Sequence, residues 1–403
     1  FFKQKTAYEI YQCDWSSDVC SSDLSLALAG CGGGSSDAAP EVVTPLALSA
    51  GGAHTAVLQS DGSLWLAGDN SHGQLGTGDG SDATTLVKVV DSGVTQVSAG
   101  FDFTAFVKTD GSVWVMGHND RGQLGLGDTT DRSVPTQLLA SGASAVAAGA
   151  AHLLVLKTDG SAWGTGANSG ENAGSLCQGD ADLNDHNALV TLVGSGVAQV
   201  AAGQVYSLLR KSDGSVWACG RDAYGQFGTD TVGSAATVPV QTVSGGVRAV
   251  VAGPTVSWLI KNDGSLWGAG YNAWGAVATG STSDWVASYT QVLASGVADV
   301  RSNGFTTLVL RSDGTVWGVG RGSSGLFGNG DNSAIGGGTL QQVASGASAL
   351  ALGGPRYTEG DFSLLLTTGA AVQAAGANDQ GQLGLGSTTA IGTWTTLVLG
   401  SGM

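Results

Sequence analysis

The sequence predicts an all-β fold, a seven-bladed β-propeller whose blades are four-stranded antiparallel sheets. Three observations lead to this prediction. One unit occurs seven times at a period of about 50 residues, which is typical of an array or a propeller. Each unit holds four short apolar runs separated by turn residues, and no segment of useful length follows the helical period. A four-stranded sheet repeated radially is a propeller blade, and seven blades lie within the usual range.

An Asp-Gly pair followed by a tryptophan marks each unit. The aspartates are Asp61, Asp110, Asp159, Asp213, Asp263 and Asp313, and the tryptophans are Trp65, Trp114, Trp163, Trp217, Trp267 and Trp317. A seventh, worn copy has Thr368-Gly369 and Val372 in the equivalent places, and the successive steps are 49, 49, 54, 50, 50 and 55 residues. We expect each Asp-Gly pair to form a type I′ hairpin turn, because both residues tolerate positive φ.

The four strands of a unit can be placed around this pair, and we name them A to D in chain order. Two apolar runs flank the pair in HTAVLQSDGSLWLAG, a strand such as Val94–Ser98 precedes them, and a fourth such as Leu86–Val90 follows. An open ring would leave two unpaired strand edges. We therefore expect the segment Val42–Leu48 and the run Trp394–Leu399 to combine in closing the ring.

Most of the repeated residues are expected to be framework. The tryptophans are large side chains that wedge between adjacent blades. His54 and His152 occupy one repeat position that other units fill with Phe103, Tyr206, Val256 and Thr306. A position that tolerates valine is not a shared metal site, and we expect no cofactor and no metal.

The N-terminal residues are not expected to belong to the fold. Residues 1–24 resemble translated sequencing-adapter read-through, and they are set aside together with Cys13 and Cys20. Leu28-Ala29-Gly30-Cys31, within residues 25–31, resembles the lipobox of bacterial lipoproteins, and residues 32–41 form a flexible linker before the propeller at 42–403. The resemblance implies lipid on Cys31, loss of residues 1–30, and an extracytoplasmic, membrane-anchored protein of the outer membrane, periplasm or cell surface. The alternative is a chance Leu-Ala-Gly-Cys.

Composition and motifs exclude several functions. The net charge is −16 and the 16 basic residues are scattered, so no nucleic-acid surface is expected. No apolar run is long enough to span a membrane as a helix. No nucleophile elbow, phosphate loop or metal-spaced histidine pair occurs, so we expect no enzyme. The stretch from Asp180 to His186 is faintly similar to a calcium loop but lacks its glycine and glutamate, and we interpret it as a solvated loop. Cys177 and Cys219 are either disulfide-bonded or free.

One family carries all three motifs of the unit. The strings A-G-x-x-H-[ST] (Ala50 to Thr55), D-G-S-x-W and G-Q-L-G resemble the repeat of the regulator-of-chromosome-condensation (RCC1) family over about residues 42–403. Gly-Gln-Leu-Gly is intact at 73–76, 122–125 and 381–384, nearly so at 225–228, altered at 275–278 and 325–328, and lost in the third unit. The resemblance implies a seven-bladed propeller.

Strand order divides the loops between two rims. The Asp-Gly turns (B–C) and the Ser-Gly links between blades are uniform and share one rim, whereas the A–B and C–D turns differ in every unit and share the other, the variable rim. Aromatic and arginine side chains on such loops are typical of protein-binding surfaces. We therefore propose these as partner-binding residues: His72, Asp102, Arg121, Tyr224, Trp274, Phe305, Arg356 and Tyr357. The alternative is drift of unselected loop tips.

Four functions remain to be weighed. The first is a lipid-anchored scaffold, monomeric, that binds an unknown protein or peptide through the variable rim. It resembles secreted bacterial propellers of this kind, which include a β-lactamase inhibitory protein. The second is guanine-nucleotide exchange, the activity that the RCC1 resemblance implies, which the acidic charge opposes. The third is a propeller enzyme acting on glycans, which would need acidic residues that converge at the hub. The fourth is a structural surface module without a dedicated partner.

Overall fold

The computed structural model describes residues 42–354 and 360–398. The chain divides into residues 1–42 and a second unit from Val43 onwards, which contains the strands of the described residues. Cys31 and the segments around it lie outside the described residues, as do Arg356 and Tyr357. Within the described part, no helix has the length and apolar character needed to cross a membrane.

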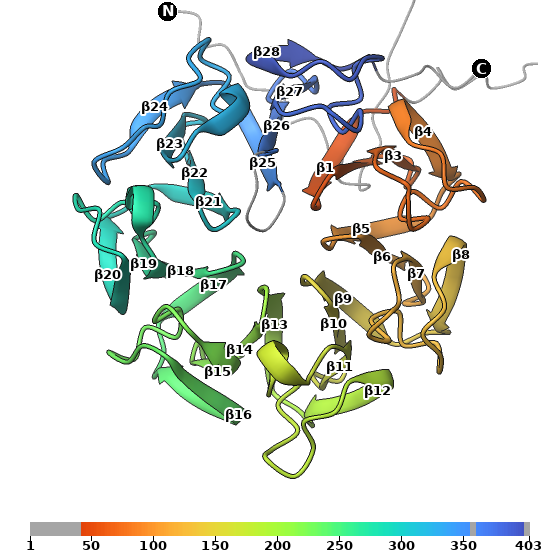
Figure 1. The fold of residues 1–403 in the computed structure, drawn as a ribbon, viewed down its shortest axis with the longest axis vertical. Helices are drawn as coiled ribbons and strands as arrows, with labels where there is room; N and C mark the ends of the chain where they lie inside the picture. Colours follow the sequence, from red (N-terminus) through yellow and green to blue (C-terminus); the bar gives the residue numbers. More distant parts are fainter. Residues whose placement is uncertain (1–41, 355–359, 399–403) are drawn as a thin grey trace, which may run out of the picture. The chain divides into compact units, whose positions relative to one another are not determined.

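Seven four-stranded antiparallel sheets follow one another around a ring (Figure 1). The first is formed by β1 (Pro45–Ala50), β2 (His54–Gln59), β3 (Leu64–Gly68) and β4 (Ala83–Val90). The second is formed by β5 (Val94–Ala99), β6 (Phe103–Lys108), β7 (Val113–Gly117) and β8 (Arg132–Leu139). The third is formed by β9 (Ala143–Ala148), β10 (His152–Lys157), β11 (Ala162–Gly166) and β12 (His186–Val193). The fourth is formed by β13 (Val197–Ala202), β14 (Tyr206–Lys211), β15 (Val216–Asp222) and β16 (Ser234–Val243).

The last three sheets have the same order. The fifth is formed by β17 (Val247–Ala252), β18 (Val256–Lys261), β19 (Leu266–Tyr271) and β20 (Trp285–Leu293). The sixth is formed by β21 (Val297–Ser302), β22 (Thr306–Arg311), β23 (Val316–Gly320) and β24 (Gln341–Ala344). The seventh is formed by β25 (Ala347–Gly353), β26 (Phe362–Thr367), β27 (Val372–Gly376) and β28 (Ile391–Thr396). Short 3-10 turns lie in three C–D loops: η1 (Gly170–Asn172), η2 (Ala273–Gly275) and η3 (Ser323–Gly325). The predicted all-β, seven-bladed propeller is confirmed.

Ring closure differs from the prediction. Val42–Leu48 and Trp394–Leu399 do not share a blade, because β1 pairs only within the first sheet and β28 only within the seventh. Each blade is instead one contiguous stretch of chain. The two end blades meet through side chains and loops, including the bridge between Thr85 and Leu385 and the hydrogen bond from Thr55 Oγ1 to Gln382 O (2.6 Å).

The Asp-Gly turns lie between strands B and C as predicted, but they are not type I′ turns. In the first blade Gly62 has a φ of 76°, whereas Asp61 does not have positive φ. The hydrogen bonds Gln59 N to Ser63 O (3.0 Å) and Gly62 N to Gln59 O (2.9 Å) define a three-residue loop that ends in a left-handed glycine. The carbonyl of Gly62 then accepts a hydrogen bond from Val94 N (3.0 Å), at the start of the next blade. This turn therefore fastens one blade to the next.

The Asp-Gly-Ser-x-Trp motif is a short relay of hydrogen bonds. In the second blade the Asp110 carboxylate accepts from Ser112 N (2.9 Å), and Ser112 Oγ accepts from the Trp114 indole N–H (2.9 Å). Lys108 Nζ lies over the indole ring, 4.8 Å from its centre. The side-chain hydrogen bond with Ser112 lowers the pKa of Asp110. The aspartates of this motif are therefore turn residues, as the sequence indicated, and the structure adds that they are held as anions.

The core is divided among the spaces between blades. Seven apolar clusters each combine the strands of two neighbouring blades, and the cluster between the first and seventh includes Trp65, Phe362 and Leu383. The motif tryptophans join these clusters: Trp114 packs against the cluster shared with the first blade, and Trp217 against the cluster shared with the third. The prediction that the tryptophans wedge between blades is confirmed.

The Gly-Gln-Leu-Gly loop is an inter-blade contact, and the third unit retains a form of it. Leu75 of the first copy is fully buried, and a side chain at Gly73 would collide with the Ser133 backbone of the next blade, 2.5 Å away. In the third unit Gly174-Ser175-Leu176-Cys177 occupies the same place, with Leu176 fully buried. The prediction that this motif is lost there is wrong, because an insertion before Gly174 moved it along the chain.

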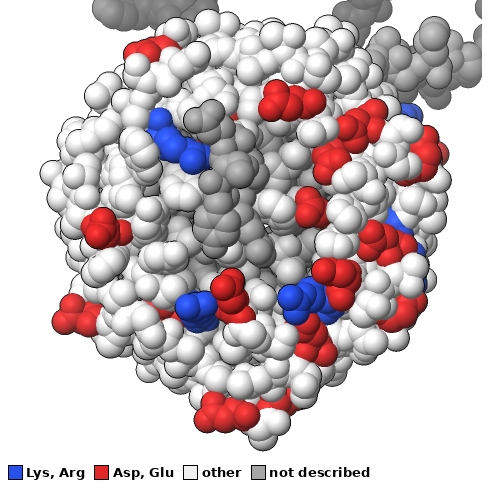
Figure 2. All heavy atoms as spheres, viewed as in Figure 1, with Lys and Arg blue, Asp and Glu red and all other residues white. Residues whose placement is uncertain are grey.

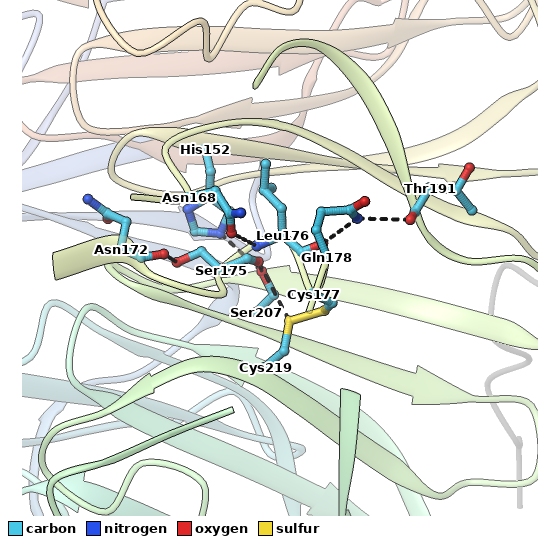
Figure 3. Close-up of a disulfide and its surroundings, with 10 residues drawn as sticks. All are labelled: His152, Asn168, Asn172, Ser175, Leu176, Cys177, Gln178, Thr191, Ser207 and Cys219. Carbon is cyan, nitrogen blue, oxygen red and sulfur yellow. Dashed lines mark hydrogen bonds between the residues drawn. A yellow bond between two sulfur atoms is a disulfide. The ribbon is translucent and has the colours of Figure 1, made fainter. Parts of the chain in front are cut away.

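The third-unit loop is closed by a disulfide. Cys177, with a φ of 57°, stands where other copies have the left-handed terminal glycine of the motif. Its sulfur is bonded to Cys219 on β15, so the disulfide joins the third blade to the fourth (Figure 3). Ser207 of the fourth blade adds a hydrogen bond from its Oγ to Ser175 O (2.7 Å) in the same loop.

The seventh copy is displaced by one residue from the predicted alignment. Thr367 N bonds to Ala371 O (2.8 Å), and Ala370 has a φ of 61°. Gly369-Ala370 therefore takes the place of Asp-Gly, and the tryptophan position is Gln373, not Val372. Val372 instead pairs with Leu366 as Leu64 pairs with Leu58 in the first blade.

The first histidine of the repeats is buried framework. His54 is fully buried and its Nε2 lies 2.9 Å from Thr104 Oγ1 of the second blade. Desolvation by burial lowers the pKa of His54 from 6.5 to about 4, and the charge of Asp69 opposes this only in part. The imidazole is therefore neutral in the folded protein at neutral pH.

We predict that Trp217→Ala lowers the free energy of unfolding by about 3 kcal/mol, because a large inter-blade side chain is lost. Trp274→Ala is the matched control, since this tryptophan is 49% exposed and its loss should cost at most about 0.5 kcal/mol. Chemical denaturation followed by far-UV circular dichroism measures both. Equal losses in the two variants would contradict the packing described above.

We predict that His54 makes the fold acid-sensitive above the range in which carboxylates titrate. Its folded pKa lies below the unfolded value, so its contribution is complete above pH 6.5 and is lost as the pH falls toward 4. The loss amounts to about 2 kcal/mol by pH 5. His54→Phe, which inserts the residue found at this repeat position in the second and seventh blades, should reduce the loss. Denaturation midpoints at pH 7 and pH 5 test this, and an unchanged pH dependence in the variant would exclude His54 as its source.

Candidate functional site

The variable rim has the same backbone support in every blade. The residue that follows the strand C glycine (Gly68 and its equivalents) donates its N–H to the carbonyl of the last residue in the A–B turn. The seven pairs are Asp69–Ala53, His118–Asp102, Ala167–Ala151, Arg221–Val205, Tyr271–Thr255, Arg321–Phe305 and Ala377–Asp361, with N···O distances of 2.7 to 3.0 Å. A fixed scaffold therefore places two variable side chains of each blade beside one another.

A buried amide holds five of the seven C–D loops from inside: Asn70, Asn119, Asn168, Asn272 and Asn378. Asn119 is fully buried, its Oδ1 accepts from Leu124 N (2.9 Å), and its Nδ2 donates to Thr130 O (3.0 Å). The fourth blade has Asp222 here, and burial raises the pKa of this carboxyl. The loop tips are thus fixed in position while their outward side chains are free to differ.

Three of these loops bring two histidines and a carboxylate together. His72 precedes the Gly-Gln-Leu-Gly motif of the first blade. In the second blade, Asp102 is the last residue of the A–B turn and His118 directly follows strand C. One nitrogen of each ring and a carboxylate oxygen of Asp102 all lie within 4.8 Å of one another. The two imidazole rings are 4.0 Å apart between centres. We name these residues the His72–Asp102–His118 cluster.

An aromatic row crosses the opposite part of the rim. Tyr224, at the tip of the fourth blade, packs edge-on against Tyr271 of the fifth at 5.1 Å, and Tyr271 packs edge-on against Phe305 of the sixth at 5.8 Å. Arg321 stacks on Phe305 at 4.6 Å and bonds to Asp361 of the seventh blade (Nη2–Oδ2 2.8 Å). Burial and the charge of nearby groups raise the pKa of Tyr271, so its phenol is neutral at neutral pH. We name Tyr224, Tyr271 and Phe305 the aromatic row.

Two exposed tryptophans lie on the fifth blade. Trp274 is 49% exposed and has a φ of 72°, a conformation that is strained for a bulky residue. Trp285 is 48% exposed and is the ladder partner of Tyr271 on β20. Paired residues on adjacent strands point to one face, so aromatic surface continues from Tyr271 to the outer strand.

Arg121 forms an ion pair with Asp185. Its Nη1 lies 2.9 Å from Asp185 of the third blade, and this hydrogen bond raises the pKa of the guanidinium. Asp185 also accepts from Asn168 N and Ser169 N (both 2.9 Å). The stretch from Asp180 to His186 is therefore held by contacts within the third blade and by the neighbouring loop of the second blade. Among the described residues, only the His72–Asp102–His118 cluster groups three candidate metal ligands.

Four of the six described rim residues fall into the two groups named above, and Arg121 and Trp274 belong to neither. His72 and Asp102 belong to the cluster between the first and second blades, whereas Tyr224 and Phe305 belong to the aromatic row. Sequence reasoning did not single out three further participants: His118, Tyr271 and Arg321. Each follows the positive-φ glycine near the end of strand C: Gly117, Gly270 and Gly320. This repeat position differs in most of the units, which is the same signal that indicated the other rim residues. The sequence does not show which residues of the adjacent blade lie beside it.

Charge is distributed unevenly over the rim. On the face shown in Figure 2, acidic side chains gather over the first three blades and basic ones are few. The first three C–D loops supply many carboxylates: Asp69, Asp79, Asp82, Asp120, Asp128, Asp131, Asp180, Asp182 and Asp185. This surface would repel a phosphate backbone.

The central channel is lined by the A strands. Its volume is about 530 Å³, and small side chains such as Ser98, Ala148 and Ala202 line much of it. The charged lining residues within the described part of the chain are Asp299 and Arg301, which pair at 3.0 Å. Glycoside hydrolysis commonly needs two carboxylates, and the described lining offers one.

Comparison with known proteins gives the family of the repeats. A model described as the regulator of chromosome condensation (RCC1) repeat matches residues 61–107 and 110–156. A second RCC1 repeat model matches residues 46–74, 94–123 and 197–226. No curated protein matches the chain.

Solved structures match most of the chain at low identity. Human WBSCR16 is 21% identical, with a TM-score of 0.71 over 84% of this chain and 94% of that one. Yeast RCC1 (Prp20) bound to Kap60 is 17% identical, with a TM-score of 0.71 over 82% of each chain. Prp20p from Saccharomyces cerevisiae is 18% identical, with a TM-score of 0.66 over 76% of this chain and 80% of that one. At these identities the similarity establishes the fold. The matched segments carry RCC1 repeats within a seven-bladed propeller.

Proposed function

We propose that this propeller is a non-catalytic binding protein that holds a protein or peptide on its variable rim. The aromatic row is the observation that carries the proposal. Tyr224, Tyr271 and Phe305 come from three successive blades and contact one another in sequence. Tyrosine, tryptophan and arginine dominate the energetics of protein interfaces, and Arg321 extends the row at one end.

The backbone conformation of Trp274 also supports a binding role for the variable rim. The sixth blade has Ser324 in its place with a φ of 59°, whereas His72, Arg121 and Tyr224 of other blades do not have positive φ, so the left-handed conformation belongs to the loop form shared by the fifth and sixth blades. Strained residues held by their surroundings are concentrated at functional sites. An exposed tryptophan in such a conformation is an anchor presented to a partner.

The kind of partner follows from charge and shape. The rim is aromatic over the fourth to sixth blades and acidic over the first three, which fits a polypeptide with apolar and basic groups. Proteins of this fold bind other proteins: yeast RCC1 was solved with Kap60, and Prp20p was studied for its binding to Gsp1p and histones. The channel, with one described carboxylate in its lining, favours binding over glycan chemistry.

We place this activity outside the cytoplasm, on a lipid anchor at Cys31. The support is the lipobox-like Leu28-Ala29-Gly30-Cys31 and the Gly/Ser-rich residues that follow. The Cys177–Cys219 disulfide agrees with export, because disulfides persist in oxidising compartments. A tether of this kind would hold the rim near the envelope surface.

We predict that truncating the rim aromatics weakens partner binding without unfolding the protein. Phe305→Ala and Trp274→Ala should each weaken binding by about 2 kcal/mol, or roughly 30-fold in Kd. The wild-type chain is first used to capture its partner from the envelope fraction of the source bacterium, and the purified pair is then titrated. Val238→Ala, a half-exposed change on the outer strand β16, is the control and should bind as wild type. Wild-type affinity in both rim variants would mean that the rim is not the interface.

We predict that the mature protein begins at Cys31 and carries lipid there. Mass spectrometry of the natural gene product reads the N-terminus and the added acyl mass directly. In a Cys31→Ser variant the protein should leave the membrane fraction. An unmodified Cys31, or a mature N-terminus elsewhere, would remove the anchor while leaving the rim proposal untouched.

A further inference from the structure

The structure assigns a second binding site to the rim: we propose that the His72–Asp102–His118 cluster binds a divalent transition-metal ion, with Zn²⁺ as the representative ligand. The three residues come from three loops of two adjacent blades. Their candidate ligand atoms already lie within 4.8 Å of one another. This site is distinct from the aromatic row and does not depend on the proposed partner.

Backbone contacts hold the three loops in place. His118 N donates to Asp102 O (2.9 Å), which fixes these two residues side by side. The loop that carries His72 is pressed onto the second blade, because Gly73 lies against the backbone of Ser133. The donors are thus brought together by framework contacts, as a preformed site requires.

A second carboxylate orients each ring. His72 Nδ1 lies 2.9 Å from Asp131 Oδ2, and the other oxygen of Asp131 accepts from Asn119 N (2.8 Å). A proton on Nδ1 directed at Asp131 leaves the Nε2 lone pair of His72 available to a metal. His118 Nε2 lies 3.6 Å from Asp120 Oδ1, too far for a hydrogen bond, but the nearby carboxylate favours a proton on Nε2 and so leaves Nδ1 for the metal. Metal-binding histidines usually donate their second nitrogen to a carboxylate in this way.

The donor set selects the class of ion. Two imidazoles and one carboxylate suit Zn²⁺, Cu²⁺ or Ni²⁺, whereas Ca²⁺ and Mg²⁺ take oxygen ligands. The rings are now tilted by 33° to one another, so they must turn about their Cβ–Cγ bonds before both lone pairs meet one ion. That torsion is broad in histidine. Three protein ligands leave a coordination position for water.

The test is metal binding by the full chain with Cys13, Cys20 and Cys31 replaced by serine, so that thiolates do not contribute. Isothermal titration with Zn²⁺ should show one equivalent bound, and Co²⁺ should give visible d–d absorption with nitrogen and oxygen ligands. His118→Ala and His72→Ala should each lower the affinity at least about tenfold and remove the Co²⁺ bands. His118→Gln serves as a second variant should the alanine change disturb the loop.

His186→Ala is the matched control. His186 also pairs with a carboxylate, Asp182 at 3.3 Å, but it has no second histidine beside it. This variant should bind Zn²⁺ as the parent does. Absence of binding by the parent, or equal binding by the His72 and His118 variants, would overturn the proposal. Because no partner is present in this experiment, its failure leaves the aromatic row unaffected.

Discussion

Packing between neighbouring blades is the interaction on which this molecule depends. A single four-stranded sheet here has apolar side chains on both faces, and each face is buried only when the next blade is in place. Repeats of this kind gain their stability from nearest-neighbour interfaces. The glycine carbonyl of each Asp-Gly turn and the buried leucine of each Gly-Gln-Leu-Gly loop serve the same interfaces. The most uniform parts of the unit are therefore the parts that touch the neighbour.

The fold was predictable because every unit has nearly the same pattern of buried and turn residues. Apolar runs of strand length recur with the same turn residues, so one blade interpreted correctly predicts most of the others. The errors fall where a copy departs from the pattern. The insertion around η1 hid Gly174 to Cys177, and the seventh copy has no tryptophan to fix its alignment. The sequence left the Cys177–Cys219 pairing open, because the bond depends on how the third blade lies against the fourth.

The site was predictable only in part, for a related reason. Variation along the chain indicates which loops face the variable rim, and six predicted residues lie on loops of that rim. It does not indicate which loop of one blade meets which residue of the next. Tyr271 contacts both Tyr224 and Phe305 only because ring geometry brings three blades together. His118 is far from His72 in sequence and stacks on it in space.

The junction between the seventh blade and the first has a consequence for how such a chain is ordered. It uses the same kinds of contact as the other junctions: Thr55 Oγ1 donates to Gln382 O, and Gly386 N donates to Thr84 O (2.7 Å). It lacks the peptide link, since no strand is exchanged across it, and it also lacks the hydrogen bond from the turn carbonyl, because Pro45, which has no N–H, stands where the second blade has Val94. The interfaces between blades therefore set the order of the blades around the ring. This order does not depend on which two blades contain the chain termini. A circular permutant cut between two other blades and joined across this junction would keep all seven interfaces.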